Sequence, residues 1–275
     1  MTGRVAEREV AVDGTRVLAR TTGGEGVPTL FVHGHPTHSE EWIPFLRRID
    51  GPALAPDLPG WGRSERPDTA GFDYSMGGLG RFLERFLDQA EVGDYKLVCH
   101  DWGAVGLIAA QAHPERVRRL VVLNAVPLLP GYRWHWIARY FWRVRGAGEA
   151  FNLAATKPAL RLLSRQATTQ PGPLTADFLD MVWRGRRPGT WPEALALYRS
   201  ADPAALEAAG ARLGELRCPA LVLWGAADSY IPARFGRAYA ERLPNSELVE
   251  LADAAHWPWI DRPDVVDRVC DFLAE

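Results

Sequence analysis

This chain has few cysteines, little net charge and no long apolar run, and each absence narrows what the protein can be. Its 275 residues include only Cys99, Cys218 and Cys270, whose wide spacing suits neither a disulfide framework nor a zinc site. We therefore expect no metal and no cofactor, and a reducing cytoplasm is the predicted location. The formal net charge is −2 and no basic stripe is visible, which argues against a nucleic-acid partner.

The apolar residues are abundant but scattered. No run approaches the length of a membrane span, and residues 1–12 mix Arg and Glu without the apolar centre of a secretory leader. A composition of 47% hydrophobic and 24% charged residues can bury a sizeable core. We expect one large domain with an insertion and no membrane partner. The oligomeric state stays open, with a homodimer as one alternative.

Apolar runs and helical patterns alternate along most of the chain. The Asp13-Gly14 pair predicts a tight hairpin turn near the beginning. The later apolar runs are continuous, which indicates strands covered by helices on both faces. This rhythm predicts an α/β fold with a mostly parallel, doubly wound sheet. The runs lie at residues 29–32, 53–55, 96–99, 120–123, 220–223 and 247–251, and the helical patterns at 77–90, 103–113, 233–243 and 264–273.

Between residues 127 and 213 the strand rhythm gives way to amphipathic helical patterns, including 136–145 and 151–165. We call residues 127–213 the cap and expect the core to comprise 1–126 and 214–275. The cap holds twelve Arg or Lys against six Asp or Glu, whereas the core holds twenty against twenty-eight. These opposite net charges favour docking of the cap on the core. Arg-rich faces that are simply solvated are an equally good interpretation.

Asp101 stands at the nucleophile position of a strand-turn-helix segment, His100-Asp101-Trp102-Gly103. An Asp that only caps the next helix is the plain alternative, but a buried strand before it and small residues after it favour the nucleophile. A carboxylate that attacks a saturated carbon forms an alkyl ester, which a base-activated water can hydrolyse. The expected partners are thus water and a small apolar substrate bearing an epoxide or a carbon–halogen bond.

Two later strand ends supply partners for Asp101. His256 follows the last apolar run and can act as the base, because the unperturbed pKa of histidine lies near neutrality. Asp228 follows the preceding run and can fix the tautomer of His256. Backbone N–H groups of His35 and Trp102 are the candidate oxyanion donors, with His33 expected to brace the loop.

At these residues the chain resembles the α/β-hydrolase fold, in its aspartate-nucleophile branch of epoxide hydrolases and haloalkane dehalogenases. The segments that carry the resemblance appear in family order across nearly the whole chain. The resemblance implies a mostly parallel sheet with an inserted helical cap. The segments are residues 33–36, 57–64, 100–103, 224–228 and 256–257.

The two families handle the leaving group differently. Epoxide hydrolases use two cap tyrosines, and Tyr198, in a Tyr-Arg pair, resembles the second of them. Tyr140 is our candidate for the first. Tyr132 is a rival, but we expect its hydroxyl to lie in water. Dehalogenases use N–H donors such as that of Trp102, and many have Asn where this chain has His35. The resemblance therefore implies an epoxide hydrolase that forms a vicinal diol. The alternatives are a haloalkane dehalogenase and a non-catalytic binding protein, against which the complete triad argues.

Overall fold

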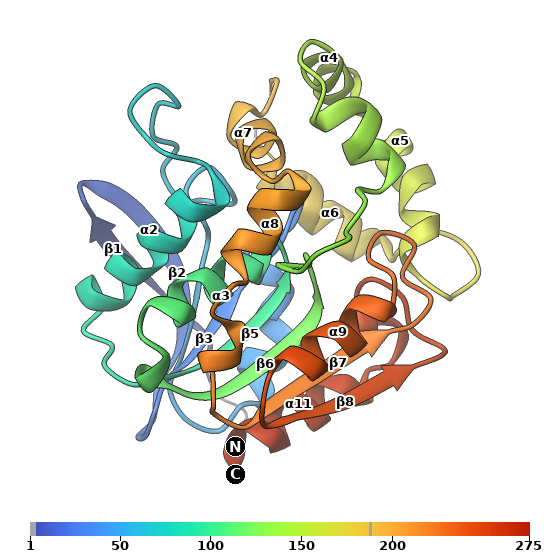
Figure 1. Ribbon diagram of the computed structural model, residues 1–275. Coiled ribbons are helices and arrows are strands. Elements are labelled where there is room, and N and C mark those ends of the chain that lie inside the picture. Colours follow the sequence, from blue (N-terminus) through green and yellow to red (C-terminus); the bar gives the residue numbers. More distant parts are fainter. Residues whose placement is uncertain (1–3, 187–188) are drawn as a thin grey trace.

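The computed structural model of the protein describes residues 4–186 and 189–275. They form an eight-stranded sheet in the order β1-β2-β4-β3-β5-β6-β7-β8 (Figure 1). Strand β2 is antiparallel to β1 and β4, and the remaining pairs are parallel. The predicted mostly parallel α/β sheet is confirmed. The strands are β1 (Ala6–Val12), β2 (Thr15–Thr22), β3 (Thr29–Val32), β4 (Ala53–Pro56), β5 (Tyr95–Asp101), β6 (Val117–Ala125), β7 (Ala220–Gly225) and β8 (Ser246–Leu251).

Helices cover both faces of this sheet, as the continuous apolar runs require. Successive residues of β3 point to opposite sides, since Leu30 and Val32 join one core cluster and Phe31 joins the other. The first cluster is closed by α2 (Met76–Gln89), α3 (Val105–Ala112) and α9 (Arg234–Arg242), and the second by α1 (Ile43–Arg48), α10 (Pro258–Asp261) and α11 (Asp264–Ala274).

The strand order creates a switch point between β3 and β5. From β3 the chain crosses to β4 on one side, and the next strand, β5, pairs with β3 on the other side. The loops after β3 and β5 therefore lie side by side at the carboxyl edge of the sheet. Open α/β sheets bind ligands in the crevice at such a point.

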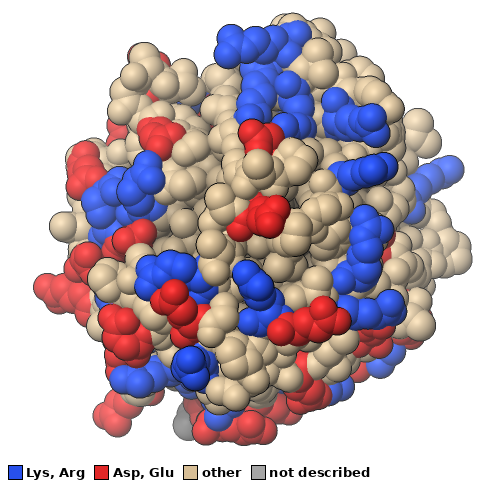
Figure 2. All heavy atoms as spheres, viewed as in Figure 1, with Lys and Arg blue, Asp and Glu red and all other residues tan. Residues whose placement is uncertain are grey.

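Most of the described residues between β6 and β7 form helices above that edge (Figure 1), and the exact limits of 127 and 213 stay a prediction. Figure 2 shows Lys and Arg side chains crowded on the upper part of the face, where the cap lies. None of the described helices is long and apolar enough to cross a membrane. The cap contains a π-helix, η4 (Ala138–Trp142), then α4 (Ala147–Ala154), α5 (Lys157–Leu163), η5 (Ser164–Ala167), α6 (Ala176–Gly185), α7 (Pro192–Ser200) and α8 (Pro203–Ala209).

The amphipathic pattern over 151–165 is helical but divided, because the chain breaks between α4 and α5. Thr156 has an extended backbone there, and its hydroxyl accepts a hydrogen bond from Ala159 N at the start of α5. Such a cap satisfies a backbone N–H that has no partner within the helix. Pro158 in the first turn also prevents continuation from the preceding helix.

Candidate active site

Asp101 ends β5 in a sharp turn that lifts its carboxyl group above the sheet. Its backbone has φ 48° and ψ −121°, a region that L-residues rarely adopt. The short helix η2 (Trp102–Ala104) and then α3 follow at once. A Cβ on Gly103 would lie only 2.0 Å from the carbonyl oxygen of Val32, so glycine is required for the helix to begin this close to β3.

The loop after β3 brings backbone donors to this carboxyl group. His35 N donates to Asp101 Oδ2 at 2.8 Å, and Trp102 N also hydrogen-bonds to Asp101. A Cβ on Gly34 would lie 2.5 Å from Asp101, so the loop could not approach with any larger residue. His33 braces this loop, since its Nδ1 donates to Gly34 O at 2.7 Å and its Nε2 accepts from Leu58 N at 2.9 Å.

His256 and Asp228 meet Asp101 from the ends of β8 and β7. His256 Nδ1 lies 2.8 Å from Asp228 Oδ2, and its Nε2 lies 3.9 Å from Asp101 Oδ1. Asp228 Oδ1 accepts hydrogen bonds from Tyr230 N at 2.7 Å and Ile231 N at 3.0 Å. The structure thus brings together the acid, base and nucleophile that the sequence indicated.

A fourth polar residue, Asn124, was missed by the sequence interpretation. It lies near the end of β6, donates from Nδ2 to Asp228 Oδ2 at 2.7 Å, and accepts from Gly225 N at 2.8 Å. This amide ties β6 to β7 and fixes the carboxylate that orients His256. The sequence did contain a signal for it, because Asn124 is a polar residue directly after the apolar run 120–123.

Burial and charge act against each other at these groups. Burial alone would lower the pKa of His256, but attraction to Asp228 and Asp101, with the hydrogen bond to Asp228, raises it above its usual value. Burial would raise the pKa of Asp228, yet His256 and Asn124 hold it below its usual range. Burial raises the pKa of Asp101, although His256 opposes this rise. His256 and Asp228 therefore favour an ion pair.

Glu41 forms a buried support beneath the site. Its Oε2 accepts from Trp257 Nε1 at 3.2 Å and lies 3.7 Å from His100 Nδ1. His100 Nε2 donates in turn to the carbonyl oxygen of His256 at 2.8 Å. Burial would raise the pKa of Glu41, but hydrogen bonding and attraction to His100 hold it low. The sequence interpretation missed Glu41, because a charged residue near a helix is normally expected at the surface.

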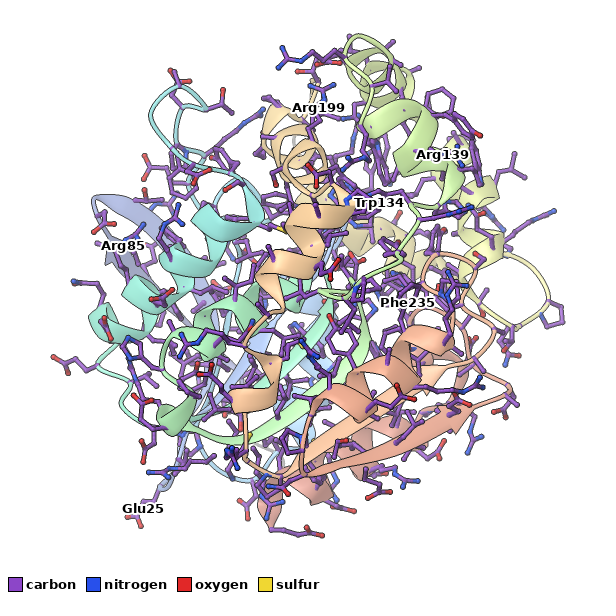
Figure 3. All side chains as sticks on the ribbon, in the orientation of Figure 1. Glu25, Arg85, Trp134, Arg139, Arg199 and Phe235 are labelled. Atoms are coloured by element: carbon purple, nitrogen blue, oxygen red, sulfur yellow. The ribbon has the colours of Figure 1, made fainter. Side chains whose placement is uncertain are left out.

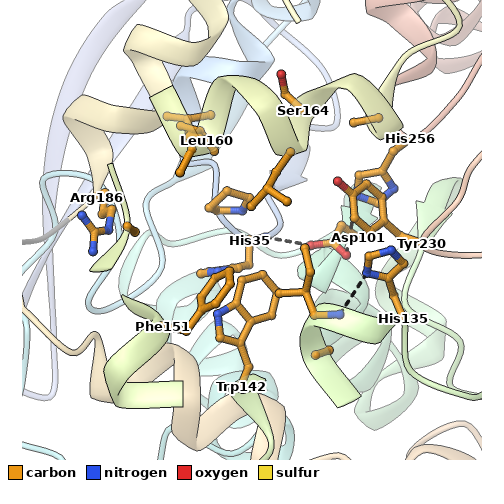
Figure 4. Close-up of a pocket in the computed structure, with 18 of the residues that line it drawn as sticks. His35, Asp101, His135, Trp142, Phe151, Leu160, Ser164, Arg186, Tyr230 and His256 are labelled. Atoms are coloured by element: carbon orange, nitrogen blue, oxygen red, sulfur yellow. Dashed lines mark hydrogen bonds and ion pairs between the residues drawn. The ribbon is translucent and has the colours of Figure 1, made fainter. Parts of the chain in front are cut away.

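A cavity of about 250 Å³ opens above Asp101 and His256, between the sheet edge and the cap (Figure 4). Aromatic and aliphatic side chains form most of its wall, including Trp142, Phe151 and Leu160. Trp134, at the junction of cap and core in Figure 3, stacks on Trp102 with ring centroids 5.3 Å apart. Within the described residues, no group of three or more His, Cys, Asp or Glu is placed to hold a metal ion.

Tyr198 lines this cavity and is only 5% exposed. Burial and the charge of Asp101 raise the pKa of Tyr198 well above its usual value, against a smaller effect of the Trp102 indole, so its hydroxyl stays protonated. Tyr132 lines the cavity too, and the expectation that its hydroxyl lies in water is wrong. It is buried and donates to the carbonyl oxygen of Tyr230 across 3.3 Å. Burial and Asp101 also raise the pKa of Tyr132.

The expectation that Tyr140 lies over Asp101 is wrong. Tyr140 is 58% exposed, does not line the cavity, and packs its ring against the Arg139 guanidinium 5.3 Å away. It lies in the π-helix η4, whose wider turns change the direction of each side chain from that in an α-helix.

Several N–H groups around the cavity are candidates to receive a leaving group. The Nε1 atom of Trp191 is buried and has no hydrogen-bond partner in residues 4–186 and 189–275, whereas the Trp102 indole interacts with the Tyr198 hydroxyl. Trp191 lines the cavity, whereas Trp102 does not and has the Tyr198 ring edge-on at 5.0 Å. His35 Nδ1 accepts from Trp61 Nε1 at 3.3 Å, which leaves the ring proton on Nε2. Burial lowers the pKa of His35 to about 3, so the ring is neutral.

Comparisons with known proteins agree with this arrangement. The family model for the alpha/beta hydrolase fold matches residues 27–263. A haloalkane dehalogenase from Bradyrhizobium diazoefficiens is 29% identical over 95% of this chain and 91% of its own length. A cis-3-alkyl-4-alkyloxetan-2-one decarboxylase from Shewanella oneidensis is 27% identical over 92% and 83% of the two chains.

Solved structures give the same grouping. The haloalkane dehalogenase DbeA from Bradyrhizobium elkani superposes with a TM-score of 0.82 at 26% identity, covering 98% of both chains. The epoxide hydrolase CorEH superposes with a TM-score of 0.81, covering 98% of this chain and 99% of that chain, and at 21% identity this likeness concerns the fold alone.

Proposed function

Since this chain belongs to the α/β-hydrolase fold family, in the group of epoxide hydrolases and haloalkane dehalogenases, we propose that it is an epoxide hydrolase acting through an ester on Asp101. Asp101 attacks a ring carbon, and the electrons of the broken carbon–oxygen bond pass to the ring oxygen. That oxygen takes a proton from a tyrosine hydroxyl. His256 then removes a proton from water, which attacks the aspartyl carbonyl carbon while the N–H groups of His35 and Trp102 stabilise the oxyanion.

The second half of the reaction restores the site. The diol oxygen leaves the aspartyl carbon and takes the proton held by His256. The regenerated carboxyl group of Asp101 then returns a proton to the tyrosinate. One epoxide and one water thus yield one diol, and no cofactor enters the balance.

The observation that carries this proposal is the pair of buried tyrosines, Tyr198 and Tyr132, which line the cavity beside Asp101 and stay protonated. Ring opening develops an alkoxide, which needs a proton or strong hydrogen bonds. Tyr132 here takes the place first expected for Tyr140. A relative whose name describes a reaction of an oxetan-2-one, another strained oxygen ring, also supports an oxygen-ring electrophile.

Haloalkane dehalogenation is the second candidate, because two kinds of observation favour it. Relatives and solved neighbours carry that name. The Nε2–H of neutral His35 and the unpartnered indole N–H of Trp191 could receive a halide. The position of Trp102 outside the cavity wall counts against it.

The test compares Tyr198→Phe and Tyr132→Phe with the wild type on styrene oxide and on 1-bromobutane. Loss of a positioned general acid should slow alkylation by the epoxide on the order of 10²–10⁴-fold, whereas a departing halide needs no proton. Rapid-quench measurement of the Asp101 ester gives the alkylation rate directly. A wild type that releases bromide and leaves every epoxide intact would replace this proposal by the dehalogenase, and binding without turnover of either would make the protein a receptor.

A further inference from the structure

Among the described residues that line the cavity, Arg186 is the single Arg or Lys. It follows α6 and lies on the opposite side of the cavity from His256 and Tyr230 (Figure 4). Most of this wall is aromatic or aliphatic, and a half-buried positive charge there is costly unless an anion or water offsets it. The surroundings of this guanidinium are therefore informative.

The contacts of Arg186 are neutral. Its Nη2 donates to the carbonyl oxygen of Asn152, and its guanidinium lies 5.2 Å from the ring centroid of Trp183. Two other cap arginines have carboxylate partners, Arg184 with Glu40 at 3.1 Å and Arg199 with Glu149 at 2.9 Å. No described carboxylate forms an ion pair with Arg186, and burial lowers the pKa of its guanidinium. Because arginine does not lose its proton in proteins, this half-buried guanidinium keeps its charge with no carboxylate partner in the described part of the chain.

Hydrogen bonds within the cap fix the residue that this guanidinium contacts. The side chain of Asn152 is held at both ends, since its Nδ2 donates to Thr190 O at 2.7 Å and its Oδ1 accepts from Trp142 Nε1 at 3.2 Å. The carbonyl group that Arg186 contacts therefore belongs to a residue fixed by two other segments of the cap. Such a preorganised donor binds an anion at little entropic cost.

We propose that Arg186 binds a carboxylate of the substrate while Asp101 attacks an electrophilic carbon at the other end of the same molecule. The negative charge of Asp101 repels an anion, so a carboxylate is acceptable only at the far side of the cavity, where Arg186 lies. The cap holds twelve Arg or Lys against six Asp or Glu, and this net positive charge also attracts an anion. The substrate class is thus an apolar chain with an electrophilic carbon at one end and a carboxylate at the other. This inference rests on the proposed function for the chemistry at Asp101.

The test uses hexanoate, which carries the carboxylate but no electrophile, and 1-hexanol, its neutral counterpart. Calorimetric titration near neutral pH gives the two affinities for the wild type, Arg186→Met and Arg186→Lys. Arg139→Met is the matched control, because Arg139 also belongs to the cap and contacts an aromatic ring, yet is exposed and outside the cavity wall (Figure 3).

We expect the wild type to bind hexanoate on the order of tenfold more tightly than 1-hexanol, as a hydrogen-bonded charge pair allows. Arg186→Met should abolish that preference, Arg186→Lys should keep part of it, and Arg139→Met should keep all of it. Equal affinity for the two ligands in the wild type, or the same preference in Arg186→Met, would overturn the assignment. Because hexanoate cannot react, this outcome is independent of whether the protein opens epoxides.

Discussion

The sheet edge and the cap face each other across one cavity but hold their polar groups in different ways. At the sheet edge, Asp228 receives hydrogen bonds from Asn124, Tyr230 N and Ile231 N in addition to His256. In the cap, the indole N–H of Trp191 has no partner within the described residues. The carboxylate of Asp228 thus has a full set of donors, whereas the cap keeps a free donor at Trp191.

This difference assigns separate tasks to the two walls. A network in which every member has partners holds its geometry, because moving one group would leave another unpaired in a region of low dielectric constant. Donors without partners are available to a ligand. We infer that the sheet edge performs the two-step chemistry and that the cap selects the electrophile, so substitutions in the two regions should change different rate constants.

The strongest test of the sheet edge removes its base. His256→Gln should still alkylate Asp101 but fail to hydrolyse the ester, and steady-state turnover should fall by about 10⁴-fold or more. Intact-protein mass spectrometry should show an adduct with the mass of the substrate-derived group, located on the peptide that contains Asp101. Asp101→Ala is the control and should carry none. A wild-type substrate that leaves His256→Gln unmodified would rule out the covalent route.

The next test weakens the support of that base. Asp228→Asn should reduce turnover by about 10³–10⁴-fold, because an amide can present the wrong partner to His256 Nδ1 and provides no charge. The new amide would also face Asn124, whose Nδ2 now donates to Asp228 Oδ2. Alkylation should suffer less than hydrolysis, so rapid-quench traces should keep a burst followed by a slow phase. Turnover within a few-fold of the wild type would mean that another carboxylate supports His256.

A smaller effect concerns pH. His256 must be neutral to accept a proton from water, and its pKa is raised above 6.5, chiefly by Asp228 acting against burial. Hydrolysis should therefore fall as pH decreases through a value above 6.5. In the ester, Asp101 has lost its charge, so Asp228 is the main group that still opposes the effect of burial on the pKa of His256. The rate of ester decay, measured as a function of pH, gives the pH at which hydrolysis falls. In Asp228→Asn this acidic limb of the profile should move to lower pH. A limb at the same pH in both proteins would contradict this cause.

The nucleophile, acid and base of the sheet edge could be located from sequence because their positions follow from topology. Asp101, Asp228 and His256 each come just after an apolar run, and the carboxyl ends of parallel strands meet at one edge. Asn124 lies at the same edge and was equally accessible to this reasoning. Glu41 was not, since its burial depends on contacts with His100 and Trp257 that are distant in sequence.

The cap could be predicted less well, because a helix face depends on local details of the turn. The pattern over 136–145 indicated an amphipathic helical segment, and the chain forms the π-helix η4 at its centre. A helix with a wider turn does not keep the 3.6-residue period, and the resemblance that suggested Tyr140 carried no information on the direction of its side chain. Tyr198 lies in the regular helix α7, and it does line the cavity.

Tyr140→Phe should give the smallest effect, and its comparison with Tyr198→Phe, at another of the three cap tyrosines, sharpens the contrast most. Tyr140→Phe removes a hydroxyl from a side chain that is 58% exposed and outside the cavity wall. Because surface substitutions away from a site change little, we expect epoxide turnover within about twofold of the wild type. The same atom removed from buried Tyr198 should slow ring opening by about 10²-fold or more. Parallel assays of the two variants on styrene oxide separate the position of the hydroxyl from its chemistry. A strong defect in Tyr140→Phe would mean that η4 rearranges on binding and turns this tyrosine inward.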